Sequence, residues 1–393
     1  MPYGYLVSIV ILAFGTLAAL APVPYRYPVV GKLGFVTGLV VNELPFLALT
    51  LLAGSTALAF AEGDIASAGS WAVVGLAALI PAGLVVVARR SLGAPGIVRA
   101  ALAEALGAGA TGGLRRTPWA SILLRPLWVH RLDVRRVRNL AYGPAGRRNR
   151  LDVYRSRAAG GATETAPVIV YFHGGGYYSG SKNREGRLML YRLAAGGFVG
   201  VSANYRLRPR ADFADHLADV ERVLAWVRTH IAEHGGDPDR VIVAGSSAGA
   251  HLAAITALTP ADTSTPDAPV TTRPLAAVCL YGYYGYYYGT GPADLPVSSP
   301  LGYAADAAPP VFVAHGDRDP MVPVEAAREF VAHLRSASPN PVVYAELPGA
   351  QHAFDLFRSV RHEAVIDGVE AFAAAVARPT ARQPEVITSS PRV

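Results

Sequence analysis

The segment Val241-Ile-Val-Ala-Gly245-Ser246-Ser247-Ala248-Gly249 separates a short apolar run from a helical stretch, AHLAAITAL, that ends at Leu258. A G-x-S-x-G turn between a strand and a helix is typical of a nucleophile elbow, which lifts the serine hydroxyl off the backbone. Gly245 and Gly249 supply the small neighbours that so sharp a turn needs. We therefore expect Ser247 to be a nucleophile at the carboxyl end of a strand.

Around this segment, apolar runs and helical stretches alternate from about residue 137 to residue 377. The expected strands are 137–142, 150–154, 168–172, 198–203, 241–244, 275–281, 311–315 and 342–347. The expected helices are 185–195, 214–234, 248–259, 324–336 and 361–376. This order predicts an α/β fold whose eight-stranded sheet is mostly parallel, begins antiparallel and has helices on both faces.

A glycine run follows the third expected strand, in the sequence His173-Gly174-Gly175-Gly176. Without side chains in the way, backbone N–H groups can point at an incoming carbonyl oxygen. We expect the Gly174 and Gly175 amides, with the Ala248 amide, to form an oxyanion hole. His173 precedes the loop and is interpreted as a structural residue.

The loops after the last two strands offer an acid and a base. Asp317 and Asp319 follow one strand, and we interpret Asp319 as the acid because it lies further along the loop, whereas Asp317 can cap the turn or pair with Arg318. Among the ten histidines, His352 alone lies in the loop between the final expected strand and the helix that follows it. The resulting chain order is Ser247, Asp319, His352, which is the order of an α/β-hydrolase triad.

With these motifs, residues 137–377 resemble the hormone-sensitive-lipase-like esterase group of α/β-hydrolases. The resemblance is carried by HGGG at 173–176, NYRL at 204–207, GSSAG at 245–249, HGDRDP at 315–320 and His352. It implies a nucleophile, an orienting acid, a base and an oxyanion hole, namely Ser247, Asp319, His352 and the amides of Gly174, Gly175 and Ala248. It implies no metal and no organic cofactor. The family often has acidic residues where this chain has Ser246 and Arg210, which leaves the substrate class open.

The first ninety residues have a different character. The chain is 51% hydrophobic with a mean hydropathy of +0.27, and we expect three transmembrane helices, at 5–21, within 33–61 and at 71–88. The continuous uncharged part of the second stretch is 44–61, so 33–41 is interpreted as an interfacial or re-entrant lead-in. Glu43 is expected at the helix mouth, solvated or near Lys32, rather than inside the membrane as a functional carboxylate. This region is similar in character to that of integral-membrane bacterial esterases of the same group.

The charges between the spans place the N-terminus outside and the catalytic domain in the cytoplasm by the positive-inside rule. A cleaved signal peptide ending at Ala21 is the alternative, and cleavage would invert this arrangement. From Arg115 to Arg157 there are twelve arginines against two aspartates. No nucleic-acid motif accompanies them, so they favour a basic segment beside a membrane over a nucleic-acid surface.

The expected organisation is therefore a membrane region at 1–90, a basic juxtamembrane or cap segment at 91–136, a catalytic domain at 137–377 and a disordered tail at 378–393. Short amphipathic helices at 97–106 and 119–129 fit either an interfacial position or a cap. Cys279, the single cysteine, lies in an apolar run, so we expect it to be buried and no disulfide to form within the chain.

The favoured function is that of a membrane-anchored serine carboxylesterase or lipase acting on a small-molecule or lipid ester. An amidase, formamidase or acyltransferase of the same fold is the alternative. A non-enzymatic membrane sensor is less favoured because all the required groups are present. The tyrosine-rich segment 281–289 fits either the wall of an acyl pocket or a lid, and the oligomeric state stays open.

Overall fold

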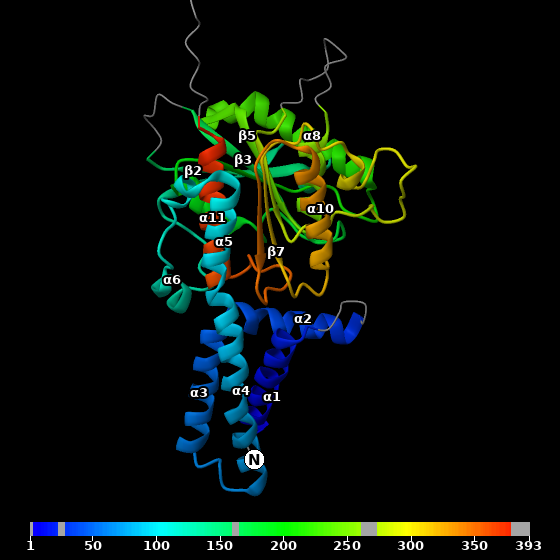
Figure 1. Ribbon diagram of the computed structural model, residues 1–393. Helices are drawn as coiled ribbons and strands as arrows, with labels where there is room; N and C mark the ends of the chain where they lie inside the picture. The colour runs from blue at the N-terminus through cyan, green and yellow to red at the C-terminus, as the bar shows by residue number, and fades with distance from the viewer. Residues whose placement is uncertain (1–2, 23–27, 159–164, 261–272, 379–393) are drawn as a thin grey trace, which may run out of the picture.

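The computed structural model describes residues 3–22, 28–158, 165–260 and 273–378. Figure 1 shows two parts, a sheet covered by helices and a helical bundle, with the helix at Pro28–Glu43 lying crosswise between them. The expected tail lies, apart from Arg378, outside the described residues.

The larger part contains one eight-stranded sheet in the order β1-β2-β4-β3-β5-β6-β7-β8. The strands are β1 (Val134–Ala141), β2 (Arg150–Ser156), β3 (Ala166–Phe172), β4 (Val199–Ala203), β5 (Gly236–Ser246), β6 (Ala276–Leu280), β7 (Val311–Gly316) and β8 (Val342–Leu347). β2 is antiparallel to β1 and β4, and the other neighbours are parallel. The expected fold class is confirmed.

Helices cover both faces, which explains why the central strands are apolar on both sides. The helices of this part are α5 (Ala94–Leu106), α6 (Trp119–Leu124), α7 (Arg187–Ala195), α8 (Phe213–His230), α9 (Ala248–Leu258), α10 (Val324–Ala337) and α11 (Val360–Val376). Short 3-10 turns occupy 108–111, 146–149, 231–234 and 300–302. α5, α7 and α11 pack in one core cluster, and α8, α9 and α10 supply the clusters that contain the other strand side chains.

α5 packs against the sheet domain. Its residues Ala94, Val98, Ala101 and Leu102 are buried in the same cluster as side chains of α11 and β8, and α5 runs beside α11 in Figure 1. The segment therefore covers the sheet. Cys279 is fully buried in β6, as expected.

The smaller part consists of α1 (Tyr3–Leu20), α2 (Pro28–Glu43), α3 (Pro45–Ala61) and α4 (Ala68–Leu92). α1 and the helical stretch Ala68–Leu106 are long and apolar enough to cross a membrane, and α2 with α3 forms a pair bent by 94° that counts as a third span if taken together. The described residues therefore hold two candidate spans, or up to three.

α2 corresponds to the interfacial lead-in expected at 33–41. It crosses α1 closely, since a Cβ at Gly38 would lie 3.1 Å from the Ala18 backbone. In Figure 1, α2 lies across the end of the bundle, directly against the sheet domain, while α3 and α4 run lengthwise.

The expectation of a solvated Glu43 is wrong. Its carboxylate is fully buried and forms an ion pair with the equally buried Arg361 of α11, with 3.2 Å between Oε1 and Nη1. Ser359 Oγ donates to the second carboxylate oxygen at 2.7 Å, and Arg361 also donates to the backbone carbonyl oxygens of Asn42 and Pro348. The sequence places these residues far apart, whereas folding gives Glu43 a full set of partners that water cannot reach.

Removing one partner of this pair leaves the other charge buried without compensation, which typically costs about 3 kcal/mol or more. We expect Glu43→Leu and Arg361→Met each to lower the thermal unfolding midpoint of the detergent-solubilised protein. The double variant should lose less than the sum of the two single losses, because it leaves no unpaired charge. Strictly additive losses in this cycle would mean that the two groups do not stabilise each other.

Candidate active site

Ser247 occupies the turn between β5 and α9 with φ +52° and ψ −119°. A non-glycine residue is held in such a conformation only by its surroundings. The Ser247 N–H donates to the carbonyl oxygen of Leu280 in β6 at 2.9 Å. A Cβ at Gly249 would lie 2.0 Å from the Phe172 oxygen, and one at Gly245 would lie 2.2 Å from the Gly249 oxygen. The strained turn thus requires glycine at both flanking positions.

Asp319 and His352 meet at the carboxyl ends of β7 and β8. The distance from Asp319 Oδ2 to His352 Nδ1 is 2.7 Å, and both side chains are buried. The other carboxylate oxygen accepts the backbone N–H groups of Met321 and Val322 at 2.8 and 2.9 Å. With Nδ1 bonded to the carboxylate, Nε2 is the imidazole nitrogen that remains for proton transfer.

The charge of Asp319 is stabilised by its neighbours. Burial alone would raise its pKa, but the His352 charge and hydrogen bonds from His315 and His352 hold the pKa of this carboxyl well below its ordinary value. His315 Nε2 lies 3.4 Å from Asp319 Oδ2. An ionised acid beside the imidazole can orient that ring and stabilise its protonated form.

Asp317 has a different partner. Its Oδ1 accepts the Gly349 N–H at 2.6 Å, and Gly349 is in the left-handed region at φ +65°. Asp317 therefore fixes the turn that precedes His352. The interpretation that Asp317 belongs to a turn agrees with this contact.

Tyr281 links the nucleophile to the histidine. Its ring packs edge-on against the His352 ring with 4.6 Å between centroids, while the preceding residue, Leu280, holds the Ser247 amide. Because β5, β7 and β8 are parallel, their carboxyl ends share one edge of the sheet. The structure thus brings Ser247, Asp319 and His352 to one edge, around a tyrosine that the sequence did not single out as a neighbour of the base.

The glycine run differs from expectation at one position. The Gly174 N–H donates to Glu185 Oε2 at 2.5 Å, so it is not free to bind an oxyanion. Among the described residues, the N–H groups of Gly175, Gly176 and Ala248 have no acceptor in the protein. The expected oxyanion hole of Gly174, Gly175 and Ala248 is therefore corrected: Gly176 takes the place of Gly174.

The loop nevertheless lies against the nucleophile. A Cβ at Gly174 would come within 3.1 Å of the Ser247 Cβ. Gly175 and Gly176 have φ values of +116° and +59°, in the region that favours glycine. The Ala248 amide begins α9, where the helix leaves its first N–H groups unpaired.

A buried polar network lies behind these groups. The Ser246 hydroxyl donates to Glu185 Oε2 at 3.2 Å and accepts from the Tyr171 hydroxyl at 2.8 Å. The Tyr281 hydroxyl donates to Asp355, and Glu185 also pairs with the half-exposed Arg184 at 3.3 Å. Ser246, which directly precedes Ser247, thus hydrogen-bonds to a carboxylate from another loop.

Asp355 shows the electrostatic consequence of this network. Burial, together with the nearby Glu185 charge, raises the pKa of the Asp355 carboxyl to about 6. Because the folded pKa lies above that of the unfolded chain, ionising Asp355 lowers the free energy of unfolding as the pH rises, up to about pH 6. The Tyr281 ring packs against His352, and its hydroxyl donates to Asp355, so Tyr281 connects His352 to this carboxyl.

We expect Asp355→Asn to raise the unfolding midpoint more at pH 8 than at pH 5, because asparagine still accepts from Tyr281 but cannot ionise. The gain in unfolding free energy should be larger by about 1 kcal/mol at pH 8. Thermal unfolding at both pH values measures this difference. The exposed Asp306→Asn is the matched control and should show no such pH dependence, and an equal shift of Asp355→Asn at both pH values would contradict the assignment.

Two further histidines near the motifs have structural partners. His173 Nδ1 contacts the Gly174 oxygen at 2.7 Å and its ring stacks on Tyr205. His251 contacts the Tyr177 hydroxyl at 2.6 Å. Burial lowers the pKa of each to about 4, so both are neutral near pH 7. Neither competes with His352 as a base.

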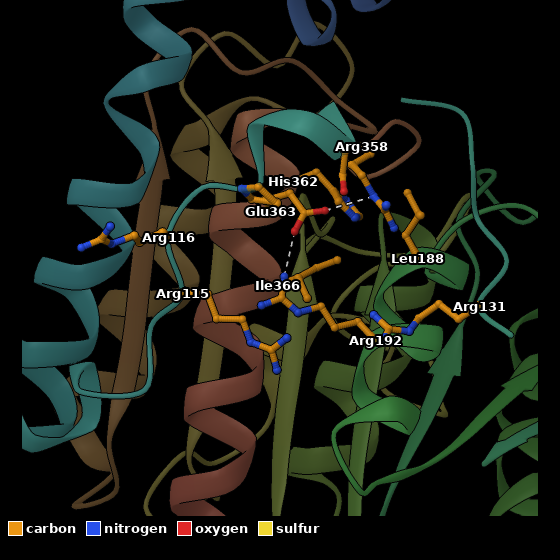
Figure 2. A pocket seen from close by; sticks show the side chains of 11 residues that line it. Arg115, Arg116, Arg131, Leu188, Arg192, Arg358, His362, Glu363 and Ile366 are labelled. Carbon is orange, nitrogen blue, oxygen red and sulfur yellow. Dashed lines mark hydrogen bonds and ion pairs between the residues drawn. The ribbon is translucent and has the colours of Figure 1, made fainter. Parts of the chain in front are cut away.

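A separate hollow of about 140 Å³ lies beside α11. Five of its eleven lining residues are arginines, and none of Ser247, Asp319 and His352 lines it. Figure 2 shows that Arg192 and Arg358 both reach Glu363 there. Arg192 also pairs with two more carboxylates of α11. The excess positive charge of this hollow is therefore largely balanced. Within the described ranges, no three His, Cys, Asp or Glu side chains are grouped so that they could hold a metal ion.

Comparisons with known proteins show which family the chain is similar to. The BD-FAE family model matches residues 151–276. LipM of Mycobacterium tuberculosis, a probable carboxylic ester hydrolase, is 37% identical over an alignment that covers 95% of this chain and 93% of LipM. Esterase LipQ of the same organism is 37% identical over 67% of this chain and 68% of its own length.

Among solved structures, the apo form of Thermogutta terrifontis esterase 2 superposes with a TM-score of 0.50 at 28% identity, covering 59% of this chain and 90% of that chain. The alignment with LipM extends further and includes most of the N-terminal helices, since it omits only 5% of the chain. The chain is therefore a carboxylic ester hydrolase and belongs to the hormone-sensitive-lipase-like esterase family of α/β-hydrolases.

Proposed function

We propose that this protein is a membrane-anchored serine carboxylesterase in which Ser247, His352 and Asp319 form the catalytic triad. The observation that carries the proposal is the buried hydrogen bond of 2.7 Å between Asp319 and His352, at the sheet edge where Ser247 occupies a strained turn. A buried carboxylate that orients an imidazole at the sheet edge where the serine lies is the arrangement that a serine hydrolase needs.

In the proposed mechanism, His352 Nε2 takes the Ser247 proton as the serine oxygen attacks the ester carbonyl. The amides of Gly175, Gly176 and Ala248 hold the resulting oxyanion. His352 then protonates the departing alcohol, which leaves an acyl-enzyme. Water, deprotonated by His352, attacks this acyl group and releases the acid, so Ser247 regains its proton.

Membrane anchoring is the second part of the proposal. Large apolar side chains on the outer surface of the bundle are exposed, among them Val7, Leu17, Leu51, Leu58 and Leu79. Such a surface is unfavourable in water and suits lipid. With α1, α3 and α4 as spans, the N-terminus lies on the opposite side from the catalytic domain, and the positive-inside rule then assigns that domain to the cytoplasm.

The proposed division of the chain follows the same elements. Residues 1–90 form the membrane region, 91–136 a basic cap segment that includes α5, and 137–377 the catalytic domain. Several arginines of the basic segment have acidic partners in the catalytic domain, for example Arg115 with Glu370 and Arg136 with Asp152. These pairs support a cap that is fixed to the domain.

We expect Ser247→Ala to abolish the hydrolysis of p-nitrophenyl esters from acetate to laurate by detergent-solubilised protein, because no other group replaces the nucleophile. The wild type should also be labelled by a fluorophosphonate probe. Ser336→Ala, an exposed serine of α10, is the matched control and should retain both properties. Faster turnover of aryl amides or formamides than of every ester would favour an amidase instead, and unlabelled, inactive wild type would refute the serine hydrolase assignment.

The two neighbouring aspartates allow a sharp test of the acid. Asp319→Asn should lower kcat by about 10³-fold or more, because the imidazole loses the partner that sets its tautomer. Asp317→Asn should cost less than about tenfold, because an asparagine oxygen can still accept the Gly349 N–H. Steady-state kinetics on one ester compares them, and a larger loss in Asp317→Asn would reverse the assignment.

A further inference from the structure

The loops that carry the acid and the base rest directly on the membrane region. Gln351 Nε2, next to His352, donates to the Ala18 oxygen of α1 at 2.9 Å. Arg318, next to Asp319, donates to the Leu20 oxygen at 3.2 Å. These carbonyls belong to the last turn of α1, where a helix leaves its oxygens unpaired. The catalytic edge of the sheet therefore faces the end of the bundle.

α2 lies between this edge and the bundle, and one of its faces contacts the active-site loops. The Phe35 ring lies 6.5 Å from the His352 ring, centroid to centroid. Leu39 is buried in the core cluster of the sheet domain, and Phe35 packs against that cluster. Asn42 Nδ2 donates to the Gly349 oxygen at 3.0 Å, in the loop that leads to His352.

The opposite face of α2 is apolar and uncovered. Val29, Leu33, Val36 and Val40 recur at the spacing of one helix face, and between 42% and 79% of each is exposed. Because α2 is bent by 94° from α3, it lies in the plane of the membrane if α3 crosses it. An in-plane helix with one apolar outer face is typical of an interfacial helix.

The segment around α6 lies beside the start of α3, at the same end of the bundle as α2. Trp119 packs edge-on against Phe46 at the start of α3 with 5.5 Å between ring centroids. Exposed apolar side chains follow along the segment, namely Leu123, Leu124, Leu127, Trp128 and Leu132. Two apolar surfaces, on α2 and after α6, thus flank the end of the bundle, and the exposed Arg125 lies in the second of them, where it can contact lipid headgroups.

We propose that the enzyme takes its substrate from the bilayer, as a long-chain acyl ester dissolved in the lipid, and that α2 lies in the membrane interface as the wall along which the ester reaches Ser247. This inference rests on the proposed function and specifies its substrate class. The carbonyl of a membrane-dissolved ester lies near the headgroups while its acyl chain stays in the hydrocarbon. The ester carbonyl would therefore lie at the level of the catalytic edge, which rests on α2 and on the end of α1.

The first test compares two esters with wild-type enzyme in phosphatidylcholine vesicles. We expect the hydrolysis of p-nitrophenyl palmitate to follow its mole fraction in the lipid, so that a fourfold increase in lipid at constant total ester lowers the subsaturated rate about fourfold. Hydrolysis of water-soluble p-nitrophenyl acetate should change by less than twofold. A palmitate rate that ignores the added lipid would overturn the inference and leave the proposed function standing, whereas failure to hydrolyse either ester would overturn both.

The second test changes the outer face of α2. Leu33→Asp combined with Val36→Asp should lower kcat/KM for palmitate in vesicles at least tenfold and leave acetate hydrolysis within twofold, which also shows that the variant folds. Leu295→Asp, at an exposed leucine of the catalytic domain, is the matched control and should affect neither ester. Unchanged palmitate hydrolysis in the α2 variant would contradict a membrane-facing α2.

A spectroscopic test is independent of activity and of the aspartate variants. Because the single native cysteine, Cys279, is fully buried, a fluorophore can be attached selectively to Val36→Cys and, for comparison, to Leu295→Cys. Brominated phosphatidylcholine should quench the label at position 36 and leave the label at position 295 unquenched. An unquenched label at position 36 would place α2 outside the membrane and overturn the inference.

Discussion

The left-handed backbone of Ser247 is the constraint on which the rest of the catalytic edge depends. A serine at φ +52° is unfavourable on its own, so its neighbours must fix it. Gly249 lets β3 approach the turn, and the Leu280 oxygen accepts the Ser247 amide. β3 and β6, which make these two contacts, also lead directly into the glycine loop and into Tyr281. The strands that stabilise the turn therefore also position the groups around it.

Buried carboxylates occur at three places in the structure, and each has different partners for its charge. Asp152 lies between Arg136 and Lys182, and Glu43 faces Arg361. Glu185 uses the amide of Gly174 and the hydroxyl of Ser246. Burial raises the pKa of the nearby Asp355, and the Glu185 charge, which is held by an amide and a hydroxyl, raises it further.

The sequence predicted those features that depend on local order along the chain. Alternating strands and helices fix the parallel sheet, and parallel strands fix which loops meet, so Ser247, Asp319 and His352 could be proposed before the structure. The role of Glu185 could not be predicted from the residues around it, because folding brings it to Gly174 and Ser246. Since Glu185 accepts the Gly174 N–H, the free amides of the glycine loop are those of Gly175 and Gly176. Glu43 was misread for the same reason, since Arg361 lies 318 residues away.

The sequence indicates that 33–41 is an interfacial or re-entrant lead-in, but it does not show which contacts fix the direction of α2. Its direction is decided by polar contacts at its end, where Asn42 and Glu43 bond to the loop and helix that follow β8. The side chains of Gln351 and Arg318 donate hydrogen bonds to the last carbonyl oxygens of α1. A flexible tether would need none of these bonds. The N-terminal helices therefore form a rigid support for the loops that carry Asp319 and His352. Under the proposed function, the same contacts would set both the position of the bilayer and the geometry of the triad.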